Sequence, residues 1–442
     1  MTTATPTRPV ERPDELAPPL TVEQSGLNVD LIVQLVVKTL HFAGELMGTA
    51  IADRVGLPFS VVEPAIDRMK TQRICEIVGG TSLGPPSYHY RITQLGREHA
   101  GTYLDRNMYT GFAPVPIEQY RRYMKRFGAG GRLKASRDEV KRAYSHLVLS
   151  DRVLDQVGPA INAGHSLFVY GPPGNGKTVI AQGIRNLMPG DQWIPYALEV
   201  DGSIIQVFDP VNHEVLPLPD PGLGLDTAAT HDRRWIHCRR PSIMVGGELT
   251  LDHLELTYNP AAGFYRAPVQ LLANGGVLVI DDFGRQQCSP QALLNRWITP
   301  LESRVDFLTL QSGQKVEVPF MVLPVFATNI KPGELVDEAF LRRIQYKVFT
   351  ESPTIDDFAQ IFENYCRHQS LEYDRALVEF LIDGPYAAKK VTMRGCQPRD
   401  LINQALALAE YREEPRVLTA DLLGAACDSY FANEDEGVSR LT

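Results

Sequence analysis

The stretch SLFVYGPPGNGKTVIAQGI, residues 166–184, constrains the fold more than any other part of the chain. It consists of a short apolar strand, a glycine-rich turn and the start of a helix, and it matches the pattern G-x-x-x-x-G-K-[ST]. Gly171, Gly174 and Gly176 allow the backbone to curl, so that its N–H groups converge on a phosphate at a helix N-terminus. The stretch therefore predicts nucleotide binding.

Two side chains of this loop carry the phosphate and metal chemistry. Lys177 is predicted to reach the β- and γ-phosphates, and Thr178 is predicted to coordinate Mg²⁺. We therefore expect ATP and Mg²⁺ as cofactors. The other predicted nucleotide contacts come from the loop and the start of its helix: Gly171, Pro172, Pro173, Gly174, Asn175, Gly176 and Val179.

A second apolar stretch, NGGVLVIDDFG at residues 274–284, ends in two aspartates. Its run of β-prone residues is typical of an interior parallel strand. Asp281 lies 104 residues after Lys177 and is predicted to hold Mg²⁺ through water, whereas Asp282 takes the position of a carboxylate that polarises the attacking water. The alternative is that the paired aspartates only cap a helix or form a turn.

Asp282 stands where a glutamate is more common, and its side chain is one methylene shorter. The shorter side chain displaces the carboxylate by roughly 1.5 Å, and misplacements of about 1 Å can slow a reaction on the order of 100-fold. A loop can move to compensate. We expect a working ATPase and leave open whether Asp282 supports fast hydrolysis.

Three later stretches follow in an order that identifies a family. ALLNRWITPLESRVDFLTLQSGQKVEVPFMVLPVFATNI (292–330) predicts a helix, a hairpin turning at 312–313 and a strand ending at 328–329. DEAFLRRIQYKVFT (337–350) predicts a short helix and a strand, and RGCQPRDLINQALALA (394–409) places an arginine near a helix start. This succession resembles the AAA+ ATPases over about residues 140 to 430, and its hairpin resembles the branch containing MoxR and magnesium-chelatase ATPases.

The resemblance implies a fold, an assembly and further site residues. It implies an α/β P-loop core with a parallel sheet of order 5-1-4-3-2, an all-α C-terminal lid and a homo-oligomeric ring, with six subunits as the family expectation. Asn329 matches the family's first sensor, which orients the water or the γ-phosphate. Arg343 matches the arginine finger that reaches a neighbouring subunit, with Arg342 as second candidate. Arg399 matches the second sensor, which joins the lid to the nucleotide.

The N-terminal part shows short helices followed by two β-prone stretches around a Gly/Pro loop, which resembles a winged helix-turn-helix domain. Between residues 28 and 106 it carries eight Lys/Arg and eight Asp/Glu, so it has no net charge. Glu63 and Asp67 on the would-be recognition helix would repel phosphates. The pattern favours docking of a protein, with duplex DNA binding and a purely structural role as alternatives.

Residues 118–142 carry nine basic and three acidic residues around a glycine-rich centre. We interpret them as a solvated helix, a hinge at 128–131 and a second helix, with a phosphate-touching basic collar as the alternative. The predicted organisation is a disordered tail 1–26, a winged-helix domain 27–107, a basic linker 108–142, an ATPase core 143–351, a helical lid 352–432 and a tail 433–442.

The long interval between the two motif strands is less regular. EVDGSIIQVFDP, residues 199–210, predicts a hairpin. Tyr258, Phe264 and Tyr265 are candidates for aromatic residues that grip a polymer in the channel of a ring. The alternative is that these rings pack within the subunit.

The amino-acid composition limits the possible location of the protein and the kinds of partner that it binds. With 44 Lys+Arg against 53 Asp+Glu the net charge is −9, so no global field draws the chain to nucleic acid or to an anionic membrane. Six scattered cysteines without a C-x-x-C pair are interpreted as reduced structural thiols. No apolar run approaches the roughly 20 residues that span a bilayer.

These features together predict a cytoplasmic, ring-forming AAA+ ATPase. We predict that it remodels protein complexes, with the winged helix as the docking domain for an unknown protein client. The alternative is a DNA-acting motor or regulator that uses the winged helix and the basic linker.

Overall fold

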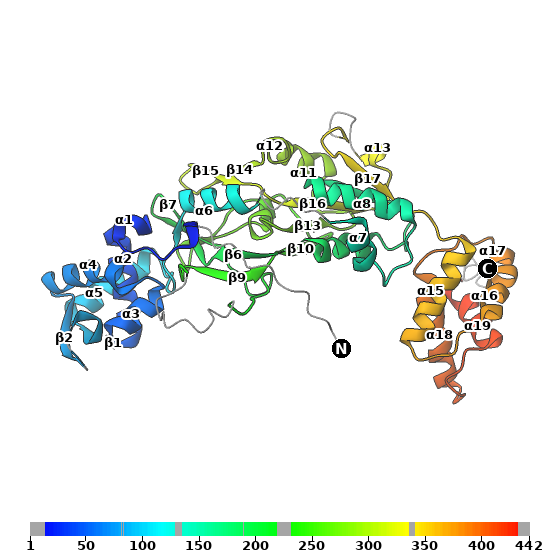
Figure 1. Cartoon of the computed structure of the whole chain (residues 1–442), viewed down its shortest axis with the longest axis horizontal. Helices are drawn as coiled ribbons and strands as arrows, with labels where there is room; N and C mark the ends of the chain where they lie inside the picture. The colour runs from blue at the N-terminus through cyan, green and yellow to red at the C-terminus, as the bar shows by residue number, and fades with distance from the viewer. Residues whose placement is uncertain are drawn as a thin grey trace, which may run out of the picture. The chain divides into compact units, whose positions relative to one another are not determined.

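The computed structural model of the chain describes residues 14–80, 82, 84–128, 135–188, 190–218, 231–335 and 341–431 (Figure 1). The chain forms two compact units. The first contains Met1–Arg132, Met188–Leu278 and Ala292–Leu323, and the second contains Leu133–Leu187, Val279–Gln291 and Pro324–Thr442. Most of the interval between the two motif strands therefore groups with the N-terminal residues, although the sequence placed it in a core at 143–351.

The N-terminal part of the first unit holds the predicted helices and hairpin. Helix α2 begins after Asn28, whose side-chain oxygen accepts the Asp30 N–H at 3.0 Å. The apolar faces of the helices share one core with a three-stranded antiparallel sheet of order β1-β3-β2. The bounds are α1 Val22–Ser25, α2 Val29–Ala43, β1 Glu45–Met47, α3 Gly48–Val55, α4 Phe59–Thr71, β2 Cys75–Gly80, η2 Pro85–Ser87, β3 Tyr88–Ile92 and α5 Gln94–Arg106.

The prediction of a disordered tail is wrong for residues 14–26. Asp14–Leu16 form the 3-10 helix η1, and the Leu16 side chain is buried. The Ser25 carbonyl accepts a hydrogen bond from Arg234 Nη1 at 2.8 Å. Apolar burial and a charge-assisted hydrogen bond offset the entropy lost when this segment orders. Residues 1–13 and 433–442 of the predicted tails lie outside the described residues.

The first half of the predicted basic linker is part of the core of the first unit. Strand β4 (Val115–Pro116) leads into α6 (Ile117–Tyr123) and the π-helix η3 (Met124–Gly128). Tyr120 and Tyr123 are buried, and the Tyr123 ring centroid lies 4.8 Å from that of Trp235. The interpretation of a solvated helix is therefore wrong, because α6 is amphipathic and buries its aromatic face. Residues 129–131 of the predicted hinge lie outside the described residues.

The first unit also contains a β-rich segment between the two motif strands. The predicted hairpin is formed by β7 and β8, and it turns at Asp201 and Gly202, whose φ angles are 46° and 81°. A five-stranded sheet has the order β11-β12-β8-β7-β4, and two further pairs are β6-β9 and β14-β15. The bounds are β6 Asp191–Pro195, β7 Ala197–Val200, β8 Ser203–Gln206, β9 Trp235–Arg239, η5 Asp252–Leu254, β11 Thr257–Asn259, β12 Phe264–Arg266, α10 Val269–Leu272, β14 Val305–Thr309 and β15 Lys315–Pro319.

The candidate channel aromatics pack inside this unit, as the alternative interpretation predicts. Tyr265 is buried, and its ring centroid lies 4.9 Å from that of Tyr258. The Phe264 ring meets the edge of Tyr109 at a centroid distance of 5.7 Å.

A separate five-stranded sheet carries both motif strands. Its order is β10-β13-β16-β5-β17, which reads 5-1-4-3-2 from β17 when its strands are numbered along the chain. β5 runs parallel to both β16 and β17. The bounds are α7 Arg137–Ala143, α8 Asp151–Ala163, β5 Leu167–Tyr170, α9 Lys177–Gly183, η4 Ile184–Leu187, β10 Ser242–Val245, β13 Val277–Ile280, α11 Pro290–Arg296, α12 Ile298–Ser303, β16 Leu323–Thr328, α13 Pro332–Leu335 and β17 Tyr346–Phe349.

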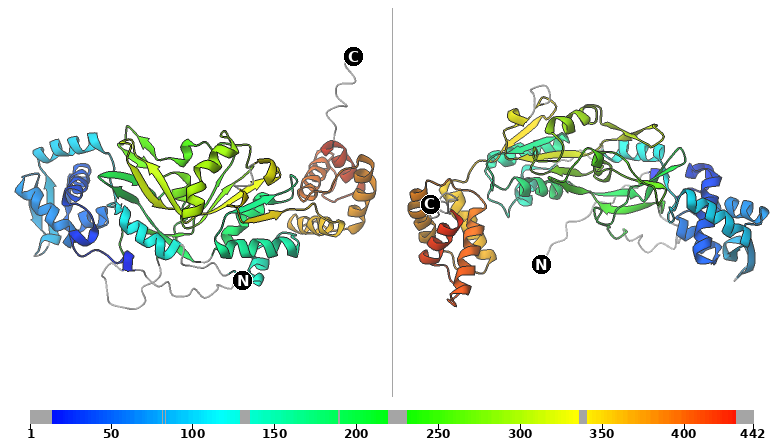
Figure 2. Two further views of the ribbon diagram at one scale, coloured as in Figure 1. Left: turned by 90° about the horizontal axis from the view of Figure 1, so that it is seen from above. Right: turned by 180° about the vertical axis from the view of Figure 1, so that it is seen from behind.

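The C-terminal residues form the predicted helical lid, whose helices gather in one bundle in both views of Figure 2. Thr354 caps α15 in a capping box with Asp357, and Thr419 caps α19 by accepting the Leu422 N–H at 3.2 Å. The bounds are α15 Ile355–His368, α16 Arg375–Leu381, η6 Ile382–Tyr386, α17 Ala387–Lys389, α18 Gln397–Tyr411 and α19 Ala420–Tyr430. Within the described ranges, no helix is long and apolar enough to cross a membrane.

Candidate nucleotide-binding site

The glycines of the loop between β5 and α9 are required by backbone conformation, and Gly171 and Gly174 also by space. Gly171, Gly174 and Gly176 have φ angles of 148°, 79° and 77°, which side chains disfavour. A Cβ at Gly171 would lie 2.4 Å from the Thr350 carbonyl oxygen, and one at Gly174 would lie 2.5 Å from Cys396 Sγ. The loop therefore packs closely against the backbone of Thr350 and against Cys396 of the lid.

Lys177 is the first residue of α9 and is largely buried. Its Nζ donates to the Pro172 carbonyl oxygen at 2.7 Å. Burial lowers the pKa of Lys177, and the nearby Asp282 and Asp281 partly oppose this shift. A phosphate oxygen would be a stronger acceptor than this neutral carbonyl, because its negative charge attracts the lysine ammonium group.

Thr178 and Asp281 meet beside Lys177. Thr178 Oγ1 lies 2.9 Å and 3.1 Å from the two carboxylate oxygens of Asp281, and the Asp282 N–H donates to Asp281 Oδ1 at 3.1 Å. Hydroxyl and carboxylate oxygens are the hard ligands that Mg²⁺ prefers, so these residues fit the predicted metal. Among the described residues, no group of three or more His, Cys, Asp or Glu side chains could hold a metal ion.

Asp282 follows β13 in a turn and has a φ of 47°. Asn329 Nδ2 donates to Asp282 Oδ1 at 3.2 Å. Gln286 stabilises this turn, because its Nε2 donates to the Asp281 carbonyl oxygen at 2.9 Å. The two aspartates thus form a turn, as the alternative interpretation has it, and their carboxylates also contact Thr178 and Asn329.

The predicted residues come together around one cavity of about 840 Å³ in the second unit. It includes the loop from Pro173 to Val179, both aspartates, Asn329 and Arg399. Gly171 and Pro172 belong to the same loop but are not among the lining residues. Residues between positions 173 and 399 of the chain therefore line one cavity, and its volume is large enough for a small-molecule ligand.

Arg399 lies at the start of α18 with its side chain 59% exposed. Its Nε donates to Asp400 Oδ1 at 2.8 Å, and this hydrogen bond raises the pKa of Arg399. Arg342 and Arg343 are not among the described residues that line the cavity. The Arg343 carbonyl oxygen accepts a hydrogen bond from Ser166 Oγ at 3.2 Å, next to β5.

Several cavity residues were missed by sequence reasoning. One group is the segment 145–149 after α7, and another is the turn Gly395–Cys396 before α18. A third comes from α15, where Ile361, Asn364, Tyr365 and His368 recur at helical spacing. This spacing is the one signal that the sequence offered for these residues. It marks one face of a helix but does not show what that face contacts.

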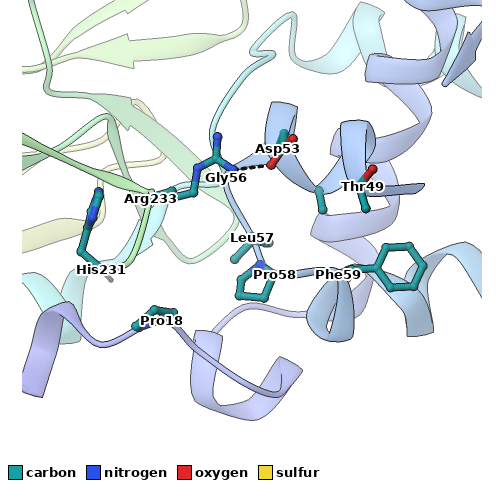
Figure 3. A pocket seen from close by; sticks show the side chains of 10 residues that line it. Pro18, Thr49, Asp53, Gly56, Leu57, Pro58, Phe59, His231 and Arg233 are labelled. Carbon is teal, nitrogen blue, oxygen red and sulfur yellow. Dashed lines mark hydrogen bonds and ion pairs between the residues drawn. The ribbon is translucent and has the colours of Figure 1, made fainter. Parts of the chain in front are cut away.

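A smaller cavity of about 200 Å³ lies in the first unit (Figure 3). Arg233 and Asp53 form an ion pair at its wall. The remaining lining residues are mostly apolar or small: Pro18, Thr49, Ala52, Gly56, Leu57, Pro58, Phe59 and His231.

Two family models match parts of the chain. Residues 153–203 match "Magnesium chelatase, subunit ChlI", and residues 354–429 match "Domain of unknown function (DUF8689)". The first match supports the AAA+ class for the segment that carries the phosphate loop. No curated protein matches the chain.

The solved structures similar to this chain include the RuvB Holliday junction branch migration motor of Thermotoga maritima. It is 15% identical, with 69% of this chain and 75% of that chain covered and a TM-score of 0.38. NtrX from Brucella abortus is also 15% identical, with 67% and 59% covered and a TM-score of 0.39. TM-scores this low support no conclusion about function.

Proposed function

We propose that the chain is an AAA+ ATPase that binds Mg-ATP in the 840 Å³ cavity and hydrolyses it. The observation that carries this proposal is the meeting of Lys177, Thr178, Asp281, Asp282 and Asn329 around that one cavity. The strand order of the sheet beneath the site and the ChlI family match support the same class.

Each of these residues has a task that follows from its contacts. Lys177 is placed to exchange the Pro172 carbonyl for phosphate oxygens. Asn329 holds one oxygen of Asp282, which fixes a carboxylate at the cavity wall that can accept a proton from water. Thr178 and Asp281 would hold Mg²⁺, which when bound supplies charge neutralisation on the phosphates.

The binding step is tested with the full chain and a fluorescent ATP analogue in the presence of Mg²⁺. We expect Lys177→Ala to weaken binding by about tenfold or more, because it removes a charge-assisted contact to phosphate. Lys389→Ala is the matched control, since this lysine pairs with Asp428 at 3.1 Å within the lid. Equal affinity of the parent and Lys177→Ala would contradict the assignment.

We propose further that the ATPase is cytoplasmic, forms a ring and remodels protein complexes. In this proposal the helices α2 to α5 with the β2–β3 hairpin form a winged-helix domain that docks a protein client. The charges on α4 support a protein over DNA: Arg68 pairs with Asp30 at 2.8 Å, and Lys70 pairs with Asp67 at 2.7 Å. Basic side chains paired in this way attract phosphate less strongly.

Salt dependence separates a protein client from DNA. The full chain is titrated with duplex DNA at about 50 mM and about 200 mM salt, because phosphate contacts make affinity fall by orders of magnitude over this range. We expect weak binding with little salt dependence. Tight, salt-sensitive binding that is lost in Arg68→Glu would favour the DNA-acting alternative.

A further inference from the structure

The side chain of Asn175 in the phosphate loop contacts two separate segments of the second unit. Its Oδ1 accepts the Gly395 N–H at 3.1 Å, and its Nδ2 donates to Ser352 Oγ at 3.4 Å. A backbone contact lies directly beside it, where the Cys396 N–H donates to the Gly174 carbonyl oxygen at 2.8 Å. The loop is thus bonded to residues that are far away in the sequence.

Both partners of Asn175 lie where the chain enters a lid helix. Ser352 lies between the end of β17 and the start of α15, and Gly395 lies two residues before α18. One amide side chain therefore joins the phosphate loop to the approaches of two lid helices.

The loop and the lid segment are also in close contact beside Gly174. The space beside Gly174 is filled by Cys396 Sγ and by Arg394 Cβ and Cδ, the latter two at 3.6 Å from a Cβ built there. Packed interfaces of this kind transmit small displacements because they lack free volume.

We propose that Asn175 is a positioning residue that couples occupancy of the phosphate loop to the position of the lid. The proposal rests on the proposed function, because it needs a nucleotide in the loop. When phosphates engage the loop backbone, the contacts of Asn175 carry the change to Gly395 and Ser352. The Asn175 amide accepts from the Gly395 N–H and donates to the Ser352 hydroxyl, and alanine at this position would lack both groups.

The coupling is measured by amide hydrogen exchange of peptides covering residues 394–396 in the full chain, with and without a non-hydrolysable ATP analogue. In the parent we expect the analogue to slow exchange at these residues several-fold. In Asn175→Ala we expect faster exchange that no longer responds to the analogue, although the analogue still binds with a Kd raised by about fivefold.

One variant separates the two bonds and another serves as control. Ser352→Ala removes the partner of the Asn175 amide nitrogen and keeps the acceptor for Gly395, so an intermediate response is expected. Arg412→Ala removes a hydrogen bond to Asp421 inside the lid, 2.8 Å long, and should leave the response to the analogue unchanged.

The outcomes distinguish this inference from the function on which it rests. If the parent and Asn175→Ala bind the analogue and show the same nucleotide-dependent protection, Asn175 does not couple the two parts, and the ATP-binding assignment stands. If the parent binds no nucleotide, both proposals are overturned.

Discussion

Asp282 is the residue on which turnover is expected to depend. Asn329 donates to its Oδ1 at 3.2 Å, a contact that an asparagine at position 282 would also accept. Asp282→Asn should therefore preserve the geometry and leave nucleotide binding near the parent value. Loss of the proton-accepting carboxylate should lower kcat by about 100-fold or more. Steady-state kinetics together with a binding titration check both halves of this prediction.

Two related variants serve as controls for Asp282. Asp281→Asn should weaken Mg-ATP binding and hydrolysis together, because an amide is a poorer ligand for a hard cation than a carboxylate. Asp282→Glu tests the length of the side chain: a faster enzyme means that the short side chain limits the rate, and a slower one means that the cavity is fitted to aspartate. Parent-like turnover in Asp282→Asn would remove this residue from the catalytic set.

Lys38 predicts a pH dependence of stability that is unrelated to the nucleotide site. It is 2% exposed, and its Nζ donates to the carbonyl oxygens of Tyr109 at 2.6 Å and Asn107 at 3.0 Å. Burial lowers the pKa of Lys38 from 10.5 to about 8. Between these values the unfolded chain binds more protons, so the free energy of unfolding rises with pH from about 8 to about 10.5.

The measurement compares the parent with Lys38→Met by urea unfolding across this pH range. The shift of Lys38 corresponds to roughly 3.5 kcal/mol at most, at about 1.4 kcal/mol per pKa unit. We expect the parent to gain stability relative to Lys38→Met as the pH rises from 8 to 10.5, because the variant lacks this titration. A difference between the two that does not change with pH would contradict the prediction.

At the scale of residues, local patterns predicted the phosphate loop and the aspartates but not what touches them. Lys177, Thr178 and Asp281 lie in motifs whose spacing carries their chemistry. Gly395 meets Asn175 across 220 residues, and neither has a pattern of its own that indicates the other. Such contacts follow from the tertiary fold, which brings together the ends of elements that are distant in the chain.

At the scale of elements, the hairpin of β11 and β12 is fixed against the end of α5 by a close approach at Gly263. This glycine has a φ of 69°, and a Cβ would lie 2.4 Å from the Arg106 carbonyl oxygen. The next contact is a hydrogen bond of 2.8 Å from the Met108 N–H to the Ala262 carbonyl oxygen. We expect Gly263→Ala to destabilise the first unit by about 2–4 kcal/mol, from backbone strain and displacement of this contact.

Gly313 provides the matched control for Gly263. It also has a positive φ, 82°, in a hairpin turn, but a Cβ there would meet no atom within 4 Å. Gly313→Ala should therefore cost only the backbone strain, about 1 kcal/mol. Urea unfolding of both variants measures the difference in their free energies of unfolding. Equal destabilisation would show that the close approach to Arg106 adds no cost to the Gly263 substitution.

Element prediction succeeded where the hydrophobic period was long and the caps were polar. The lid helices and α2 are examples, because Thr354, Thr419 and Asn28 mark their starts. It failed for η1, which has only three residues and whose Leu16 is ordered by tertiary burial. For α6 the helix was predicted but its burial was not, because a high count of basic residues obscured the aromatic face.

At the scale of the whole molecule, the sequence could not indicate that the first unit is discontinuous. Its parts come from three stretches of the chain, and residues from the first two meet around Arg234. This side chain is fully buried with Asp232, and it also donates to the Ser25 carbonyl at 2.8 Å and to Gln119 Oε1 at 3.1 Å. Local sequence patterns do not predict such a network, because its residues share no periodicity.

Assembly into a ring is expected if Arg343 is an arginine finger, because such a residue acts on the neighbouring subunit's γ-phosphate. We expect the full chain to form a ring with a saturating ATP analogue, as measured by light scattering. We also expect Arg343→Ala to bind ATP normally but to hydrolyse it about 10³-fold more slowly, the lower range for loss of such a finger.

Mixing two inactive variants tests whether Arg343 acts on the neighbouring subunit or on its own. Lys177→Ala subunits cannot hold the phosphates but offer an intact Arg343, whereas Arg343→Ala subunits hold the phosphates and lack the finger. If the finger acts across an interface, mixed rings recover hydrolysis at sites that pair an intact Lys177 with a neighbour's Arg343. If Arg343 acts within its own subunit, mixing restores nothing, because neither kind of subunit carries a complete site. Arg342→Ala, mixed in the same way, tests the second candidate, and a monomer whose hydrolysis is unchanged by Arg343→Ala would rule out the finger.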